Sequence, residues 1–375
     1  MPVTVDGFTQ EELDYLIYAT LSEKVALDGS VTPLDRIDTP TYNYLMRKAK
    51  KTGDPVRGGF RFNVKGKREQ ALQWWDTNDI LSFEEHLPGT TMTFYVGKSH
   101  LGDTISYDLV ERTGIRIDYN RGIREGAQRR QTVERVVDVI KEIADDIKYD
   151  SRLELAKTIM QANTATPKAP IGLDGLIPLN SPTAGTVGGK SRSNAMFQHN
   201  VPAAAWTRDN LLSNLQTFVK VCQRRSNGRR IDWITCGDDF YQFIVDIFSG
   251  AGASAAANTS AGKFDFRSAR DKAMAMGEKY KIGLPQDCFM YEDKMIVNDP
   301  VFDELNRVDP TGGSIPWPKR CYFLCTDYIG VIPVLSDMVV PHPMPYNQRV
   351  QHTSYHGELA LFSILPNAQG VAYVG

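Results

Sequence analysis

One long amphipathic segment constrains the fold of this chain more than any other feature. Between Thr132 and Ala162, apolar side chains recur at intervals of three and four residues along one face, which is the periodicity of an α-helix. At about 1.5 Å per residue the helix would be about 46 Å long, more than twice the average in globular proteins. Pro167 and Pro170 are expected to end it. Beside the apolar face, acidic residues recur at every fourth position: Glu134, Asp138, Glu142, Asp146, Asp150 and Glu154.

A basic segment with a strand-like alternation precedes this helix. At 55–98, apolar and polar residues alternate on both sides of a polar stretch that contains Trp74 and Trp75, which predicts a two-stranded ribbon with an irregular tip. Residues 47–68 carry nine Lys or Arg and one acid, Asp54. Because an isolated ribbon is marginal in water, we expect this one to lie on another surface. The alternating apolar positions are Phe60, Phe62, Val64, Met92, Phe94 and Val96.

Two short helical segments lie before the ribbon. Thr9 and Glu12 form the pattern of a capping box at the start of the first, and the second covers about 41–51. Both are too short to be stable alone, so we expect them to need a neighbouring surface. After the ribbon, alternating patterns predict strands at 104–111 and 114–120.

The second half of the chain reads as a separate α/β domain that follows a Gly-, Pro- and Ser-rich connector at 163–205. Thr207 is the expected cap of a helix that ends near Cys222. A strand at 231–237 and a helix at 238–248 follow it. Further strands are expected at 287–299, at 320–334, and as a closing pair around 355–365 and 369–375.

The composition is that of an ordinary globular protein. The chain is 42% apolar and 23% charged, with a formal net charge of −2, which argues against general binding of nucleic acid or anionic membranes. Five scattered cysteines predict reduced, mostly buried thiols. No run approaches the roughly 18 apolar residues of a membrane span, and the N-terminal sequence lacks the pattern of a secretory signal.

Two motifs could form a nucleotide-binding or metal-binding site. Ala184 to Ser191 fits a relaxed phosphate-loop pattern, but neither the buried strand before it nor the helix after it is present, which favours a Gly-rich structural loop. His352 and His356 would share one face of a strand, where packing is more common than metal binding. We therefore expect no catalytic, cofactor or metal site, and a chain that is not an enzyme.

The order of several segments resembles the major capsid proteins of tailed bacteriophages, of the Hong Kong 97 type. The segments are 57–68, 91–122, 171–193, and 319–334 with 355–375. The resemblance implies an α+β fold with an N-terminal arm at 1–54 and an extended β-hairpin loop at 55–98. It also implies a peripheral domain at 99–204 and 343–375, with a spine helix at 132–162, and an axial α/β domain at 205–342.

The resemblance also implies a function and its partners. The chain would be a structural protein whose hexamers and pentamers form an icosahedral shell around double-stranded DNA, with weak non-specific DNA contact. It would assemble in the host bacterial cytoplasm and reside in the virion capsid, with a separate scaffolding protein, a portal and cement proteins as partners. Two alternatives remain: a cellular nanocompartment shell of the same fold, and a nucleotide-binding enzyme using the loop at Gly185–Ser191.

In that family the extended loop lies across a neighbouring subunit. The resemblance therefore predicts an intersubunit contact in which the acidic ridge of the spine helix accepts the loop of another copy. The expected loop residues are Arg57, Arg61, Lys65, Lys67, Arg68, Trp74 and Trp75, and the expected ridge residues are Glu134, Asp138, Glu142, Asp146, Asp150 and Glu154.

Overall fold

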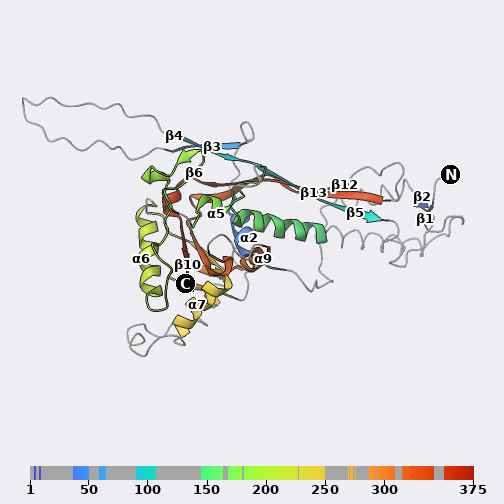
Figure 1. Cartoon of the computed structure of the whole chain (residues 1–375). Helices are drawn as coiled ribbons and strands as arrows, with labels where there is room; N and C mark the ends of the chain where they lie inside the picture. Colours follow the sequence, from blue (N-terminus) through green and yellow to red (C-terminus); the bar gives the residue numbers. More distant parts are fainter. Residues whose placement is uncertain are drawn as a thin grey trace, which may run out of the picture.

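Two sheets and a set of helices make up the part of the chain that the structure, a computed structural model, describes (Figure 1). The described residues are 4–5, 8–9, 37–49, 59–64, 90–106, 145–163, 168–179, 181–226, 228–249, 269, 271–272, 275, 287–292, 294–308, 315–341 and 350–375.

The larger sheet has five strands in the order β14-β11-β8-β10-β9. Strands β8 and β10 are parallel, and the other neighbours are antiparallel. All residues of β8, β10 and β11 are buried, which explains why their sequences are mostly apolar rather than alternating. The strands are β8 (Trp233–Cys236), β9 (Cys288–Tyr291), β10 (Lys294–Asn298), β11 (Arg320–Leu324) and β14 (Gly370–Tyr373).

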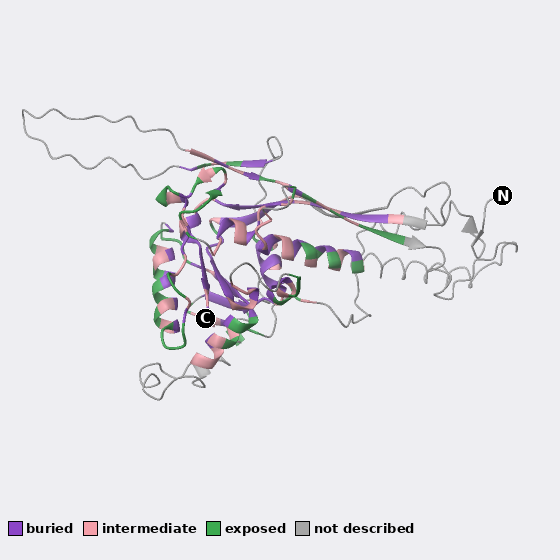
Figure 2. Ribbon diagram, viewed as in Figure 1, coloured by how far each residue is buried: buried purple, intermediate pink, exposed green. Residues whose placement is uncertain are grey.

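Helices cover both faces of this sheet. On one face, α6 (Leu211–Arg224) and α7 (Asp238–Ser249) bury a core that includes Phe218, Phe240 and Phe323. On the other face, α2 (Pro40–Arg47) and α9 (Val301–Val308) contribute to a second core. Figure 2 shows buried residues concentrated in the sheet and on the helix faces that cover it.

The start of α6 differs from the sequence expectation. The residue before the helix is Asn210, and its side-chain Oδ1 accepts a hydrogen bond of 2.9 Å from the backbone N–H of Thr207. Thr207 was the expected cap, so that assignment is wrong by three positions. The apolar spacing still places Leu211, Leu215 and Cys222 on the buried face, because periodicity and not the cap sets which face is buried.

A second, three-stranded antiparallel sheet extends to one side of the molecule (Figure 1). Its order is β12-β13-β5, with β5 at Gly97–Ser106, β12 at Ile329–Pro341 and β13 at Val350–Ser363. Strand β5 begins seven residues before the strand expected at 104–111. The rest of that strand and the one expected at 114–120 lie outside the described residues.

The two strands at the C-terminus do not form a pair with each other. Strand β13 lies between β12 and β5, whereas β14 pairs with β11, with Val371 opposite Tyr322. The expected closing pair is therefore wrong. The chain leaves one sheet after Ser363, passes the 3-10 helix η3 (Pro366–Ala368) and enters the other sheet, so the C-terminus ties the two sheets together.

Part of the predicted long helix is described. Residues 145–160 are helical, and residues 132–144 of the prediction lie outside the described part. The helix ends at residue 160, before either proline. Asn163 follows it with a left-handed φ of 55°, and its Nδ2 donates hydrogen bonds to Thr158 O and Pro170 O. The returning chain passes so close that a Cβ on Gly172 would lie 2.0 Å from Gln161 O, which only glycine tolerates.

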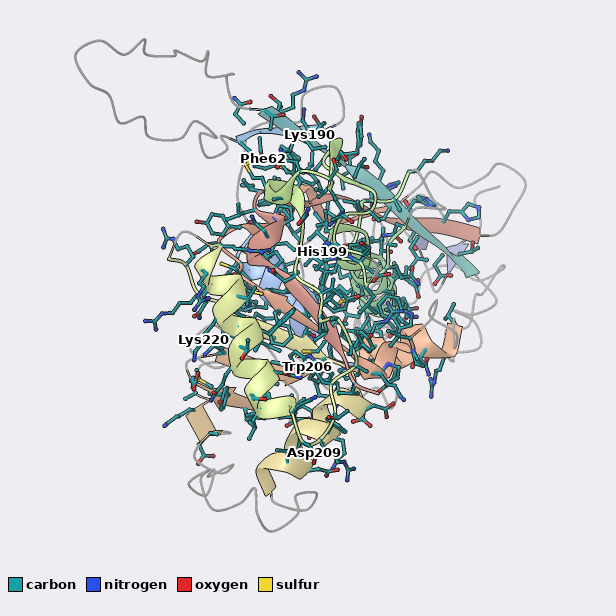
Figure 3. All side chains as sticks on the ribbon, turned by 60° about the vertical axis from the view of Figure 1, so that its left-hand side comes forward. Phe62, Lys190, His199, Trp206, Asp209 and Lys220 are labelled. Carbon is teal, nitrogen blue, oxygen red and sulfur yellow. The ribbon has the colours of Figure 1, made fainter. Side chains whose placement is uncertain are left out.

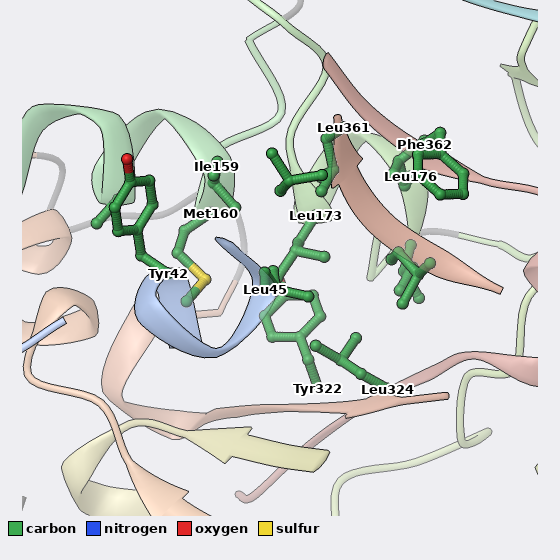
Figure 4. Close-up of a cluster of buried hydrophobic side chains, with 14 of the residues drawn as sticks. Tyr42, Leu45, Ile159, Met160, Leu173, Leu176, Tyr322, Leu324, Leu361 and Phe362 are labelled. Atoms are coloured by element: carbon green, nitrogen blue, oxygen red, sulfur yellow. The ribbon is translucent and has the colours of Figure 1, made fainter. Parts of the chain in front are cut away.

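One hydrophobic core joins this helix to both sheets. Leu45 of α2, Ile159 of the helix at 145–160, Tyr322 of β11 and Leu361 of β13 are all buried in it (Figure 4). Leu173, on the short helix α5 (Leu173–Leu176), fills the space between them. The two sheets are therefore packed on shared side chains.

The remaining elements are short. Strands β1 (Thr4–Val5) and β2 (Phe8–Thr9) pair with each other, so Thr9 lies in a strand, and Glu12 with the rest of the first predicted helix lies outside the described residues. No helix among the described residues is long and apolar enough to span a bilayer. The other elements are β3 (Gly59–Val64), β4 (Thr90–Tyr95), β6 (Thr186–Val187), β7 (Lys190–Ser191), η1 (Ala195–Phe197) and η2 (Trp317–Lys319).

Candidate intersubunit surface

The base of the predicted ribbon forms the first part of the site. Strands β3 and β4 pair, as the alternation predicted, and their register places Phe60 opposite Phe94. Phe62 stacks on Phe362 of β13 with ring centroids 4.8 Å apart, and the backbone N–H of Thr93 donates to Gly188 O. The base of the ribbon is therefore fixed on its own subunit.

Gly188 belongs to the segment that resembles a phosphate loop. Strands β6 and β7 form a tight hairpin whose two turn residues, Gly188 and Gly189, have φ of 55° and 77°. A Cβ on Gly188 would lie 2.8 Å from Met92 Cβ, so the turn packs against β4. Gly185–Ser191 thus forms a hairpin that is followed by the 3-10 helix η1 and not by an α-helix that starts at the glycines, which favours the structural interpretation of this loop.

One of the predicted basic loop residues is described. Arg61 is exposed on β3, on the face opposite Phe60 and Phe62 (Figure 3 marks Phe62 and the nearby Lys190). The other loop residues of the prediction lie outside the described part of the chain: Arg57, Lys65, Lys67, Arg68, Trp74 and Trp75.

Three residues of the acidic ridge are described, and all are exposed. Asp146, Asp150 and Glu154 follow one another at intervals of four along the helix at 145–160. Burial, followed by the charges of Asp146, Glu154 and Asp103, raises the pKa of Asp150. Asp103 comes from β5, and sequence reasoning missed it because its partners lie far along the chain. The remaining ridge residues lie outside the described part: Glu134, Asp138 and Glu142.

The ridge also contains cations. Lys157 Nζ lies 2.9 Å from Glu154 Oε1, so part of the acidic charge is satisfied within the helix. Exposed pairs of this kind contribute at most about 1 kcal/mol.

The second helix of the predicted arm, α2, packs on its own subunit. Tyr44 of α2 stacks on Trp233 of β8 at a centroid distance of 4.0 Å. Lys48 Nζ forms an ion pair of 2.5 Å with Asp232 Oδ2, and Thr41 N donates to Asp299 Oδ2 at 3.3 Å. Asp299 is fully buried, and this burial raises its pKa to about 6.

Two buried polar networks hold the connector between the helix at 145–160 and α6. Arg320 Nη1 lies 3.3 Å from Asp174 Oδ1, which also accepts a hydrogen bond of 3.0 Å from Tyr322. Arg192, which is 1% exposed, donates to His199 Nδ1 and to the backbone oxygens of Gly175 and Leu176. Neither pattern is visible in the sequence, since its members are separated by intervening elements.

The cysteines, and the two histidines singled out in the sequence, lie within the described part of the chain. All five cysteines are free and buried, as the sequence predicted. His352 and His356 lie on β13, where His352 Nδ1 contacts Thr104 Oγ1 and the ring of His356 packs against His100 at 4.9 Å. Among the described residues, no group of three or more His, Cys, Asp or Glu could hold a metal ion.

Solved structures share this arrangement over nearly the whole chain. The cyanophage A-1(L) capsid asymmetric unit matches with a TM-score of 0.54 at 12% sequence identity, covering 93% of this chain and 96% of that chain. The capsid of an empty GTA particle with C5 symmetry matches with a TM-score of 0.54 at 10% identity, covering 94% and 95%. The fold is that of capsid chains. A chain of Mycobacterium phage Ogopogo matches with a TM-score of 0.52 at 10% identity, covering 95% and 98%.

The likeness lies in the fold and not in the residues. No protein-family model matches the sequence, and no curated protein is significantly similar to it. The α+β architecture and the resemblance to phage capsid proteins, both expected from the sequence, are confirmed at the level of the fold.

Proposed function

We propose that this chain is the major capsid protein of a tailed bacteriophage, of the Hong Kong 97 type. In this proposal its copies form hexamers and pentamers of an icosahedral shell around double-stranded DNA. The observation that carries it is the likeness to the cyanophage capsid chain, which spans 93% of this chain and 96% of the other. A shared partial domain would not give coverage of both chains.

The proposal keeps the predicted division of the chain. Residues 1–54 form the arm, 55–98 the extended loop and 205–342 the axial domain, with 99–204 and 343–375 forming the peripheral domain. The shared core and the passage of β14 into the five-stranded sheet mean that these segments do not fold as independent units. The scaffolding protein, portal and cement proteins, assembly in the host cytoplasm and weak DNA contact belong to the same proposal.

The intersubunit contact is the mechanism of assembly in this proposal. The extended loop of one copy places its basic residues against the carboxylates of a neighbour's helix, around Asp150. Arg61 is exposed, and so are Asp146, Asp150 and Glu154, which supports a contact at these positions. Each exposed pair contributes at most about 1 kcal/mol. Repetition over many copies lets such pairs set the register of assembly.

Electron microscopy of the purified full-length chain tests the proposal. Closed icosahedral particles, or separate hexamers and pentamers, are the expected result. A stable monomer would contradict it. The double charge reversal Arg61→Glu with Lys65→Glu should prevent assembly while leaving the subunit folded, and normal shells from this variant would contradict the proposed contact.

The alternatives receive less support. An enzyme that uses Gly185–Ser191 to bind a nucleotide is disfavoured, because that segment is a hairpin packed on Met92. A nanocompartment shell would have the same fold. The phage and GTA capsids among the structural matches favour the phage interpretation, and DNA-free particles loaded with an enzyme would reverse that preference.

A further inference from the structure

A basic surface lies at the C-terminal end of α6 and on its connection to β8. A pocket of about 300 Å³ opens there, and its lining contains no acidic residue. Figure 3 shows Lys220 on α6, distant from Asp209 at the other end of the helix. The pocket is lined by Lys220, Gln223, Arg224, Gly228, Arg229 and Arg230. We call these residues, together with Arg225, the α6 patch.

The α6 patch carries more positive charge than its own subunit neutralises. Arg225 Nη1 donates to Asn200 Oδ1, and Arg229 forms a 3.5 Å ion pair with Asp327 in which both side chains are more than half exposed. Within the described part of the chain, Lys220 and Arg224 form no ion pair. The carbonyl groups at a helix C-terminus favour a nearby cation, but this weak effect does not account for both Lys220 and Arg224.

An acidic surface lies at the other end of β8. Since β8 and β10 are parallel, the helices that follow them, α7 and α9, begin at the same edge of the sheet. Asp238 and Asp239 lie in the first turn of α7, and Asp303 and Glu304 in the first turn of α9. We call these four residues the acid cluster. Burial, followed by the charges of Asp238, Asp239 and Glu304, raises the pKa of Asp303. The charge of Arg307, which also forms a 2.7 Å ion pair with Glu304, opposes this rise only in part.

The two surfaces lie at opposite ends of β8. The α6 patch precedes β8 and the acid cluster follows it, so the strand separates them within one subunit. Contact between different patches on two copies is heterologous, and repeated contacts of this kind close into rings when the rotation allows it. A shell built from rings needs such a pair of surfaces on every copy.

We propose that the α6 patch of one copy docks on the acid cluster of the next copy within a ring. The inference rests on the proposed function and adds a second contact to it, between axial segments and separate from the extended loop. The partner is a second copy of this chain, because the chain itself supplies the complementary charge. A nucleic acid phosphate backbone is the competing occupant.

Charge-swap variants of the full-length chain test this contact. Arg224→Glu with Arg229→Glu, and separately Asp239→Lys with Asp303→Lys, should each lower the particle yield by about tenfold or more, since like charges then face each other. The variant that combines all four changes should recover much of the yield. Arg208→Glu, at the opposite end of α6, is the matched control and should change the yield by less than about twofold.

A disulfide test does not depend on charge. Arg224→Cys combined with Asp303→Cys should give covalently linked oligomers after oxidation of assembled particles. The native thiols are all buried and will not compete. Far-ultraviolet circular dichroism of each variant verifies that its subunits are folded.

The outcomes separate the inference from the proposed function. If the wild-type chain forms no particles, both are wrong. If it forms particles and both single-surface reversals also do, or if no intersubunit disulfide forms, the inference alone is overturned. If the Arg→Glu pair only reduces retained nucleic acid, while the Asp→Lys pair assembles normally, the patch binds phosphate and the docking inference is wrong.

Discussion

Arg192 donates a hydrogen bond to Nδ1 of His199 at 2.6 Å, inside the connector and out of contact with solvent. His199 Nε2 lies 2.5 Å from Pro178 O, so the ring acts as an acceptor on one side and a donor on the other, which requires the neutral imidazole. Burial and the charge of Arg192 lower the pKa of His199 to about 4. An arginine and a neutral histidine thus fix this loop without a carboxylate.

His199 should make the fold sensitive to acid. The unfolded chain binds a proton at this residue at about pH 6.5, and the folded chain only at about pH 4, so stability from this group falls as the pH drops between these values. The loss should reach about 3 kcal/mol at most. Urea unfolding of wild type and His199→Gln at pH 7 and pH 4.5 measures it. Equal pH dependence in both proteins would contradict the prediction.

Asp299 should have the opposite effect. Its pKa is raised from 3.8 to about 6 by burial, so the folded chain binds a proton first, and this group adds stability as the pH falls from about 6 to 4. In wild type the two groups should largely cancel. Asp299→Asn should therefore lose stability on acidification more steeply than wild type. The slope of the unfolding free energy against pH is the measurement, because the substitution also changes the hydrogen bond that this buried group accepts from Thr41.

Removing one member of the Asp174–Arg320 pair should be costly. Arg320 is 3% exposed, and Asp174→Asn removes the negative charge that lies 3.3 Å from this buried cation, at a cost of about 3 kcal/mol in unfolding free energy. Replacing both residues, as Asp174→Asn with Arg320→Met, should cost less than the sum of the two single changes. Asp209→Asn, at an exposed position, is the control and should change stability by less than about 0.5 kcal/mol.

Alanine substitutions at Gly188 and Gly189 test whether the hairpin of β6 and β7 packs against the base of the ribbon. Both have positive φ, but a Cβ on Gly188 would lie 2.8 Å from Met92 Cβ, whereas a Cβ on Gly189 meets nothing within 4 Å. Gly189→Ala should cost about 1–2 kcal/mol from backbone strain alone. Gly188→Ala should cost about 1–3 kcal/mol more because of the clash. Thermal unfolding compares the two, and equal losses would show that the hairpin does not press on β4.

Local patterns in the sequence predicted the elements well where burial repeats regularly. Helix α6 buries one face, which gives its sequence a helical period, and β8 and β11 are buried on both faces, which gives them apolar runs. Both patterns can be recognised within a short stretch of consecutive residues. The alternation of Phe60 and Phe62 with Arg61 gave β3 in the same way. The ends of helices were predicted less well, as Thr207 and Asn210 show. Several polar residues near the start of a helix can accept hydrogen bonds from its first N–H groups.

The sequence did not predict which distant segments would pair. The residues of β14, 370–373, do not indicate that this strand pairs with β11 and not with β13, because a short apolar strand can pair with either. The ion pair of Asp174 and Arg320 could not be predicted either, because it forms only once α5 lies against β11. The same holds for the candidate site: the acidic ridge was readable by its period, whereas Asp103 and the acid cluster depend on which elements become adjacent.

The core that Leu45, Ile159, Tyr322 and Leu361 share has a mechanical consequence. A subunit whose two sheets rest on the same interdigitated side chains cannot bend between them without opening that packing, and close-packed interiors resist such deformation. In a closed shell, five-fold and six-fold positions differ in curvature. In the proposed shell the adjustment would then fall on the surfaces where copies meet, and the contacts at the edges of each subunit, not a bend within it, would set the angle between neighbours.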